Sequence, residues 1–327
     1  MRKTVDDGWR SPVADAVGEL WDIDPAGLRF WRSSSVHVFV VPPGSDDRGV
    51  LYARFAPYDG TAGRRLRQGA ELGELLKAAG AAVAGVVGSR SGAVVERVST
   101  PLGDMAACVL HRVEGEELDA DDLVAEDARA WGLALAAFHR TAGEVGSSAA
   151  SRPDQAVPDA FAALAAHAER HGDAELASAA SHLRGVYARL DPESLVLGHG
   201  DFELDNLRWS GGQAVCFDLD ESGVMPAPVD VASAVRDLLG PCPGSPQHPE
   251  LLAAFLDGYR LGSSRAISPD QLLLHRASFA AEHVLEAPAV LDLNPAGTGW
   301  LPDLAASLVR HYKGERTIIL ATAAVVP

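Results

Sequence analysis

The sequence has few cysteines and no long hydrophobic run. Its three cysteines (Cys108, Cys216 and Cys242) are scattered over 327 residues, so they form neither a metal-binding spacing nor a disulfide framework, and they indicate a reducing compartment. The longest apolar run, residues 317–326, is far shorter than a membrane-spanning helix. Charged residues rather than the apolar segment of a signal peptide follow Met1. We therefore expect a cytoplasmic protein without a membrane segment.

Positive charge is also scarce. The chain has 28 lysines and arginines against 45 acidic residues, a formal net charge of −17, and its only lysines are Lys3, Lys77 and Lys313. Nucleic acids and anionic membranes are bound through basic faces, so neither is an expected partner. The negative balance is compatible with a cationic substrate, although solubility alone also explains it.

The most informative stretch is 195–220. It begins with a short apolar run that predicts a buried strand, and a His-Gly-Asp sequence follows directly. Two further short runs flank a Ser-Gly-Gly-Gln turn, which is typical of a β-hairpin. If Trp209 pairs opposite Ala214, the register places Asn206 opposite Phe217.

This register brings polar side chains to one end of the hairpin. Directly opposed residues lie about 5 Å apart, so Asn206 would lie beside Asp218. Amide and carboxylate oxygens are ligands that suit Mg²⁺. Asp201, on the preceding loop, is left to act as a base. Together these groups could perform phosphoryl transfer, which needs a metal at the phosphates and a carboxylate at the attacking hydroxyl.

The pattern His-Gly-Asp-x-x-x-x-Asn, followed about a dozen residues later by an Asp at the end of a strand, resembles the aminoglycoside phosphotransferase and choline kinase group of kinase-like enzymes. The resemblance implies that Asp201 orients or deprotonates the acceptor hydroxyl and that Asn206 and Asp218 bind Mg²⁺. It also implies ATP as co-substrate, with GTP not excluded, and a structural role for Asp230. A second His-Gly-Asp sequence, at residues 171–173, is surrounded by alanine-rich helical sequence and predicts no site.

The resemblance implies an α+β, bilobal protein-kinase-like fold. Residues 1–113 would form a nucleotide-binding lobe with a small antiparallel sheet and one main helix. Residues 114–327 would form a larger, mostly helical lobe for catalysis and substrate binding. Apolar runs predict strands of the small sheet within residues 28–41, 49–55, 93–98 and 106–111.

The resemblance also implies that a cation on a strand contacts the nucleotide phosphates. The family often has Lys at the position of Arg54, and no lysine of this chain lies on a strand nearby, so Arg54 is the local candidate. A guanidinium can bind phosphate oxygens through two hydrogen bonds. The resemblance implies an acidic partner for this cation on the next helix. We choose Glu71, 17 positions later; Glu74 shares its helix face, and a solvated face is the alternative for both.

Two further nucleotide contacts rest on the resemblance. Ser34 lies in a turn of small residues that would cover the phosphates, although the sequence is equally compatible with a plain hairpin turn. The backbone around Leu110 and Arg112 would contact the edge of the adenine.

The predicted function is therefore an ATP- and Mg²⁺-dependent transfer of the γ-phosphoryl group to a hydroxyl of a small molecule. A cationic acceptor such as an aminoglycoside or amino alcohol is favoured mildly by the charge, and the enzyme would be a monomer or homodimer. The alternative is a catalytically silent nucleotide- or partner-binding module, which Arg54 in place of Lys and the glycine-free turn would suit. Phosphorylation of proteins is disfavoured because no activation segment ends in Ala-Pro-Glu.

Overall fold

The computed structural model describes residues 4–25, 27–146, 157–190, 195–240, 246–291 and 301–327. The chain divides into two compact units. Unit 1 comprises Met1–Asp119, Ala136–Arg152 and Leu197–Val224, and unit 2 comprises Ala120–Leu135, Pro153–Val196 and Met225–Pro327. Unit 1 thus includes the stretch around Asp201. The assignment of nucleotide binding to residues 1–113 and of catalysis to residues 114–327 stays a prediction.

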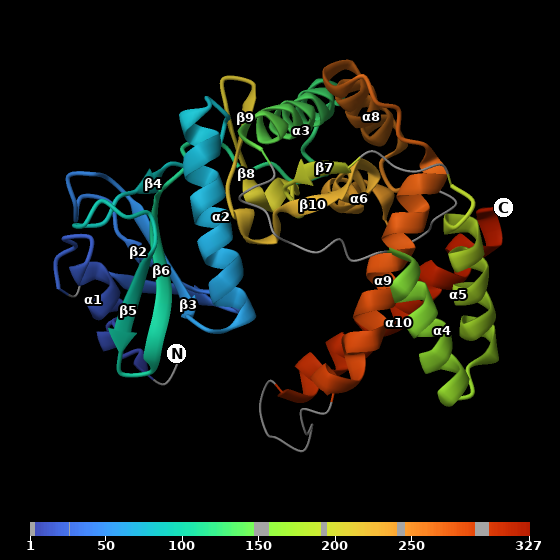
Figure 1. Ribbon diagram of the computed structural model, residues 1–327, viewed down its shortest axis with the longest axis horizontal. Helices are drawn as coiled ribbons and strands as arrows, with labels where there is room; N and C mark the ends of the chain where they lie inside the picture. The colour runs from blue at the N-terminus through green and yellow to red at the C-terminus, as the bar shows by residue number, and fades with distance from the viewer. Residues whose placement is uncertain (1–3, 26, 147–156, 191–194, 241–245, 292–300) are drawn as a thin grey trace. The chain divides into compact units, whose positions relative to one another are not determined.

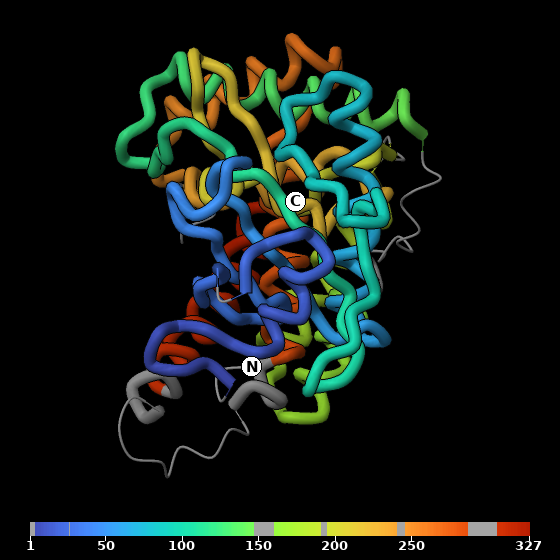
Figure 2. The backbone as a smooth tube through the Cα atoms, turned by 90° about the vertical axis from the view of Figure 1, so that its left-hand side faces the viewer, coloured from blue at the N-terminus to red at the C-terminus, as the bar shows by residue number. Residues whose placement is uncertain are grey.

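Unit 1 is built on a six-stranded sheet in which the strand order is β1-β2-β3-β6-β4, with β5 paired to β6. All of these pairings are antiparallel, and the chain that forms them runs from blue to blue-green in Figures 1 and 2. The predicted strand regions are therefore confirmed, with a short additional strand, β4. The strands are β1 (Arg29–Ser33), β2 (His37–Val41), β3 (Leu51–Pro57), β4 (Val86–Val87), β5 (Glu96–Thr100) and β6 (Gly103–His111).

Each face of this sheet packs against a different helix. Helix α1 (Pro12–Glu19) begins after Ser11, whose side chain accepts a hydrogen bond from the Val13 backbone, as expected of an N-cap followed by proline. Its apolar side chains join a core with Phe39 and Phe55. Helix α2 (Thr61–Ala78) covers the other face. Because side chains alternate along a strand, the second face also receives Arg54.

A hairpin of strands β8 (Leu207–Ser210) and β9 (Gln213–Cys216) completes unit 1. Both of its outer edges are hydrogen-bonded to earlier parts of the chain. Glu116 and Trp209 exchange two backbone hydrogen bonds of 2.8 and 2.9 Å on the β8 side. On the β9 side, the Cys216 backbone bonds to Ala82 and Ala84. These bonds attach the hairpin to the connection after α2 and to the segment after β6.

Unit 2 is mostly helical. Four of its helices, α4, α5, α9 and α10, bury alanine, leucine and isoleucine side chains in a common core. No helix among the described residues is long and apolar enough to cross a membrane. The helices are the first part of α3 (Ala125–Val145), then α4 (Val157–Arg170), α5 (Ala174–Tyr187), α6 (Ala227–Ala234), α7 (Arg236–Leu239), α8 (Pro249–Ser263), α9 (Pro269–Leu291) and α10 (Leu301–Val325).

Candidate active site

The register predicted for the hairpin is confirmed. Trp209 lies opposite Ala214, and the Phe217 backbone N–H donates a 3.1 Å hydrogen bond to the carbonyl of Asn206, one step beyond the last ladder pair. The hairpin therefore brings Asn206 to the strand end from which Asp218 follows. Strand β7 (Leu195–Gly198) leads into the loop with Asp201, and the 3₁₀ helix η3 (Leu204–Asn206) returns that loop to the hairpin.

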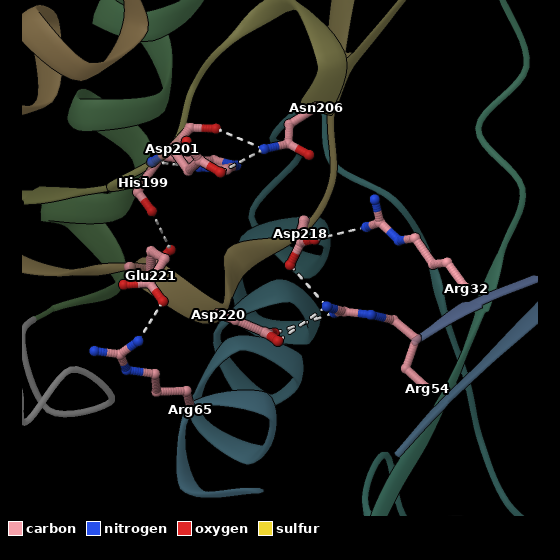
Figure 3. Close-up of polar contacts among 10 residues, drawn as sticks. Arg32, Arg54, Arg65, His199, Asp201, Asn206, Asp218, Asp220 and Glu221 are labelled. Carbon is pink, nitrogen blue, oxygen red and sulfur yellow. Dashed lines mark hydrogen bonds and ion pairs between the residues drawn. The ribbon is translucent and has the colours of Figure 1, made fainter. Parts of the chain in front are cut away.

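Asn206 is bound to Asp201. Its side-chain nitrogen donates to the Asp201 backbone carbonyl at 3.0 Å and to the Asp201 carboxylate at 2.9 Å. Both partners are acceptors, so the amide nitrogen must face Asp201 and the amide oxygen must point away from it, as Figure 3 shows. Asn206 is buried and Asp201 is half-buried. The bonds fix the position of the carboxylate that was predicted to receive the acceptor proton.

His199 supports the same loop from within the core. It is fully buried between the rings of Phe138 and Phe202, each with its ring centroid 5.4 Å from the imidazole. Its Nδ1 accepts a hydrogen bond from the Asp201 backbone N–H at 3.3 Å. These contacts brace the loop that carries Asp201.

Gly200 is required by a close approach of two segments. Its φ is +82°, and a Cβ built there would lie 2.2 Å from the Glu221 carbonyl oxygen. The Ser222 hydroxyl bonds to the carbonyl of His199 at 3.2 Å. Only glycine therefore lets the Asp201 loop contact the segment after Asp218, which forms the 3₁₀ helix η4 (Leu219–Glu221) and then strand β10 (Gly223–Pro226).

Asp218 has a constrained backbone and two cationic partners. Its φ and ψ are 66° and 62°, a left-handed conformation that is uncommon for a residue other than glycine and typical of functional sites. One carboxylate oxygen accepts from Arg54 Nη2 at 2.7 Å and the other from Arg32 Nη2 at 3.4 Å. Arg32 is exposed and Arg54 is buried. The strand end thus carries one carboxylate between two guanidinium groups (Figure 3).

The two arginines share one row of the sheet. Val38 lies opposite Arg32 on one side and opposite Arg54 on the other, and Cys108 follows in the same row. Side chains in one such row point to the same face. Burial raises the pKa of the Cys108 thiol to about 12, so this neighbour of Arg54 is a neutral thiol.

The acidic partner of Arg54 is Asp220 and not Glu71. The guanidinium donates to both Asp220 carboxylate oxygens, at 3.1 and 2.9 Å, whereas Glu71 is exposed on α2. The expected pair of Arg54 with Glu71 is therefore not formed in this structure, and Glu74 is exposed as well. Any other role of Glu71 towards the nucleotide stays a prediction.

Glu71 does not pair with Arg54 because of the face that α2 presents to this site. It consists of Gly69, Ala70 and Gly73, which line a cavity of about 20 Å³ together with Arg54. A Cβ on Gly69 would lie 2.8 Å from the carbonyl carbon and oxygen of Leu219. The absence of side chains there lets η4 pack directly on the helix. Asp220, on η4, then supplies the carboxylate that this face of the helix lacks.

Burial sets the electrostatics of this cluster. Burial raises the pKa of Asp220, with Asp218 adding to the rise and Arg54 opposing it. Burial alone would lower the pKa of Arg54, but Asp220 and Asp218 more than offset this, and its pKa is raised. The guanidinium therefore stays charged, and it compensates two carboxylates in a poorly hydrated environment.

The other residues predicted to contact the nucleotide are Leu110, Arg112 and Ser34. Leu110 lines the same small cavity as Arg54. The Arg112 backbone N–H donates to the carbonyl of Val50 at 3.0 Å, so this donor is already used within the sheet. Ser34 lies exposed between β1 and β2, and its N–H donates to Val36. Binding of a nucleotide by these three residues stays a prediction.

Asp230 and the second His-Gly-Asp sequence both lie in unit 2. Asp230 is fully buried in the first turn of α6, and its expected contact with the catalytic loop stays a prediction. Asp173 caps α5, accepts a hydrogen bond from Leu176, and pairs with Arg316 at 2.9 Å. The second sequence is therefore the start of a helix.

Comparison with known proteins identifies the family. The sequence profile of the phosphotransferase enzyme family matches residues 37–267, which include both β3 and the Asp201–Asp218 segment. The chain belongs to this family, as the resemblance implied, and it is a phosphotransferase. No curated protein sequence matches it significantly.

Solved structures show the same fold. An amicoumacin kinase in complex with AMP-PNP and Ca²⁺ matches with a TM-score of 0.66 at 17% identity, over 91% of this chain and 90% of the other. A microcompartment-associated aminopropanol kinase matches with a TM-score of 0.60 at 17% identity, over 93% and 94%. A choline/ethanolamine kinase family protein from Mesorhizobium loti gives 0.55 at 16% identity, over 95% and 98%. These similarities confirm the kinase-like α+β fold.

Sequence reasoning missed two participants. The sequence analysis assigned no site role to Arg32 and did not identify Asp220 as the partner of Arg54. The signal for Arg32 is the strand register, which places it in the row of Arg54. The signal for Asp220 is the run of small residues on α2, which leaves space for a second carboxylate beside the strand cation.

Proposed function

We propose that this protein transfers the γ-phosphoryl group of ATP to a hydroxyl of a small molecule, with Mg²⁺ as the metal. The observation that carries the proposal is the hairpin register, which gathers Asp201, Asn206 and Asp218 at one strand end. Membership of the phosphotransferase family supports the reaction type. ATP is supported by the amicoumacin kinase complex, which contains the ATP analogue AMP-PNP.

The donor atoms fit magnesium. Asn206 is held so that its amide oxygen points away from Asp201, and Asp218 follows from the opposing strand. Both residues offer hard oxygen ligands, which Mg²⁺ prefers to nitrogen or sulfur. Asn206 and Asp218 would hold the ion, which when bound neutralises charge on the phosphate oxygens. Arg54 and Arg32 both bond to Asp218, and they would add positive charge at the same phosphates.

Asp201 is assigned to the acceptor. Its carboxylate is kept in place by Asn206 and its backbone by His199, so it can accept a hydrogen bond from a hydroxyl without reorganising the loop. The acceptor we favour is a small amino alcohol or aminoglycoside. The net charge of −17 favours a cationic acceptor, and an aminopropanol kinase is among the proteins of the same fold.

The test is ATP consumption on a panel of hydroxylated amines, with Asp201→Asn as the key variant. Removal of a catalytic carboxylate should lower kcat by about 10²- to 10⁴-fold while Mg-ATP binding is retained. Asp205→Asn is the matched control, because Asp205 is the exposed neighbour on η3, and it should stay within about twofold of wild type.

Two results would contradict the proposal. A wild-type protein that binds Mg-ATP but transfers phosphate to no acceptor, including water, would indicate the silent binding module instead. An Asp201→Asn variant that keeps full transfer activity would show that another group positions the acceptor.

A further inference from the structure

A cluster of metal-binding side chains lies in unit 2, outside the site described above. Helices α9 and α10 pack against each other there (Figure 1). His283 lies on α9, and His311 and Glu315 lie one turn apart on α10. One ligand atom from each of these three side chains lies within 4.8 Å of the other two. We call this group the α9–α10 histidine cluster.

Two of its distances are close to those between ligands of a single ion. His283 Nδ1 lies 3.6 Å from one Glu315 oxygen, and His311 Nε2 lies 3.6 Å from the other. These separations exceed the 2.7–3.2 Å of an N–H···O hydrogen bond. Ligands about 2.0–2.2 Å from a tetrahedral zinc ion are about 3.3–3.6 Å apart. Each imidazole therefore lies from a Glu315 oxygen at about the spacing of two ligands of one metal ion, and the ligand atoms of all three side chains lie within 4.8 Å of one another.

Burial and charge favour a cation in the same place. The Glu315 side chain is only 14% exposed, whereas the two imidazoles are about half exposed, at 49% and 52%. The Glu315 carboxylate is thus more deeply buried than the two imidazoles, which face solvent. Arg316, the neighbouring residue, does not compensate it, because its guanidinium bonds to Asp173 and Glu175.

The field at His283 is also negative. Glu315 raises the pKa of His283 against the opposing effect of burial, and Glu286 and Glu282 add to the rise. The negative charge of these nearby carboxylates also attracts a divalent cation.

We propose that the α9–α10 histidine cluster binds one divalent transition-metal ion, with zinc the best match, and so links α9 to α10. Two imidazole nitrogens and one carboxylate oxygen form a donor set that zinc accepts and that magnesium does not prefer. Three protein ligands leave a fourth position for water. The contribution of α10 is preorganised, because residues four apart lie on one helix face.

The experiment uses the full-length protein, freed of metal with a chelator that is then removed, in excess Mg²⁺ to occupy sites made of oxygen ligands. Titration with Co²⁺ should give one equivalent of visible absorption typical of low-coordinate cobalt, and Zn²⁺ should displace it. At free zinc of about 100 times Kd, the folded-to-unfolded ratio should rise about 100-fold, seen as a higher Tm.

Three variants decide where the metal binds. His283→Ala and Glu315→Gln should each weaken binding by more than the ~10- to 100-fold typical for loss of an outer-shell partner. His171→Ala is the matched control, since His167 and His171 form the other close histidine pair described in unit 2, with stacked rings 4.2 Å apart. This control should leave the affinity unchanged.

The proposal is overturned if the wild type shows no saturable binding, if both cluster variants bind as well as wild type, or if binding is lost in His171→Ala. Circular dichroism of each metal-free variant checks the fold. If His283→Ala does not fold, Glu315→Gln, which preserves the shape of the side chain, decides the question.

Discussion

The partnership of Arg54 with Asp220 can be tested by replacing Asp220 with asparagine, which removes the charge and keeps the shape. Both side chains are about nine-tenths buried, at 9% and 11% exposure. Hydrogen bonds to charged groups contribute about 1.5–3 kcal/mol each, and loss of the only partner of a buried charge costs about 3–5 kcal/mol. Asp218 still bonds to Arg54 in the variant. We therefore expect the free energy of unfolding to fall by about 2–3 kcal/mol.

Urea unfolding followed by circular dichroism measures this loss, and Glu71→Gln is the control. Glu71 is exposed on α2, so its variant should lie within about 0.5 kcal/mol of wild type. The KM for ATP should rise in Asp220→Asn, because Arg54 is no longer fixed from that side, and should be unchanged in Glu71→Gln.

A double-mutant cycle with Arg54→Met isolates the pairwise energy. The coupling between Arg54 and Asp220 should be about 1.5–3 kcal/mol, in the range found for residues in one ion-pair network. A coupling below about 0.5 kcal/mol would refute the reasoning. A Glu71→Gln variant that raises the KM for ATP as much as Asp220→Asn does would also refute it, because Glu71 would then be the group that holds Arg54 in solution.

Two further predictions concern stability. Gly200→Ala should cost at least about 2 kcal/mol in urea unfolding, because the new Cβ meets the Glu221 carbonyl at a positive φ; a loss below about 0.5 kcal/mol would contradict that close approach. Arg316→Gln should lower the free energy of unfolding by about 0.5–1 kcal/mol at neutral pH, since its ion pair with Asp173 is about one-third exposed. Arg316 lowers the pKa of Asp173, so this stabilisation is present above the unfolded pKa of about 3.9 and is lost as pH falls through the lower folded value. A difference between the two proteins that persists unchanged at pH values well below about 3 would exclude this pair as its source.

The sequence predicted the parts of the site that depend on local pairing. A Gly-Gly turn between two short apolar runs fixes the hairpin register, and the register alone brings Asn206 to the strand end before Asp218. The apolar run at residues 49–55 predicted the strand that carries Arg54, and the family resemblance together with the lack of a nearby lysine selected Arg54 as its cation. These features depend on neighbours in sequence, so they can be derived without knowing the tertiary packing.

The partner of Arg54 could not be predicted in the same way. Glu71 and Asp220 are both acidic, and the choice between them depends on how closely η4 approaches α2, which is a tertiary contact. Helical spacing shows which residues share a face but not which face is turned to the sheet. The metal-binding arrangement of His283 with Glu315 was missed for the same reason, since it joins helices separated in sequence.

The glycine at position 69 has an evolutionary implication. Because the Leu219 backbone occupies the space of its side chain, a glutamate introduced there would have to push η4 off the helix and withdraw Asp220 from Arg54. A glutamate at position 69 and the contact of η4 with α2 that is seen here therefore exclude each other. A lineage could exchange one for the other only by changing helix and loop together, so single substitutions at either place should be deleterious in isolation and tolerated in combination.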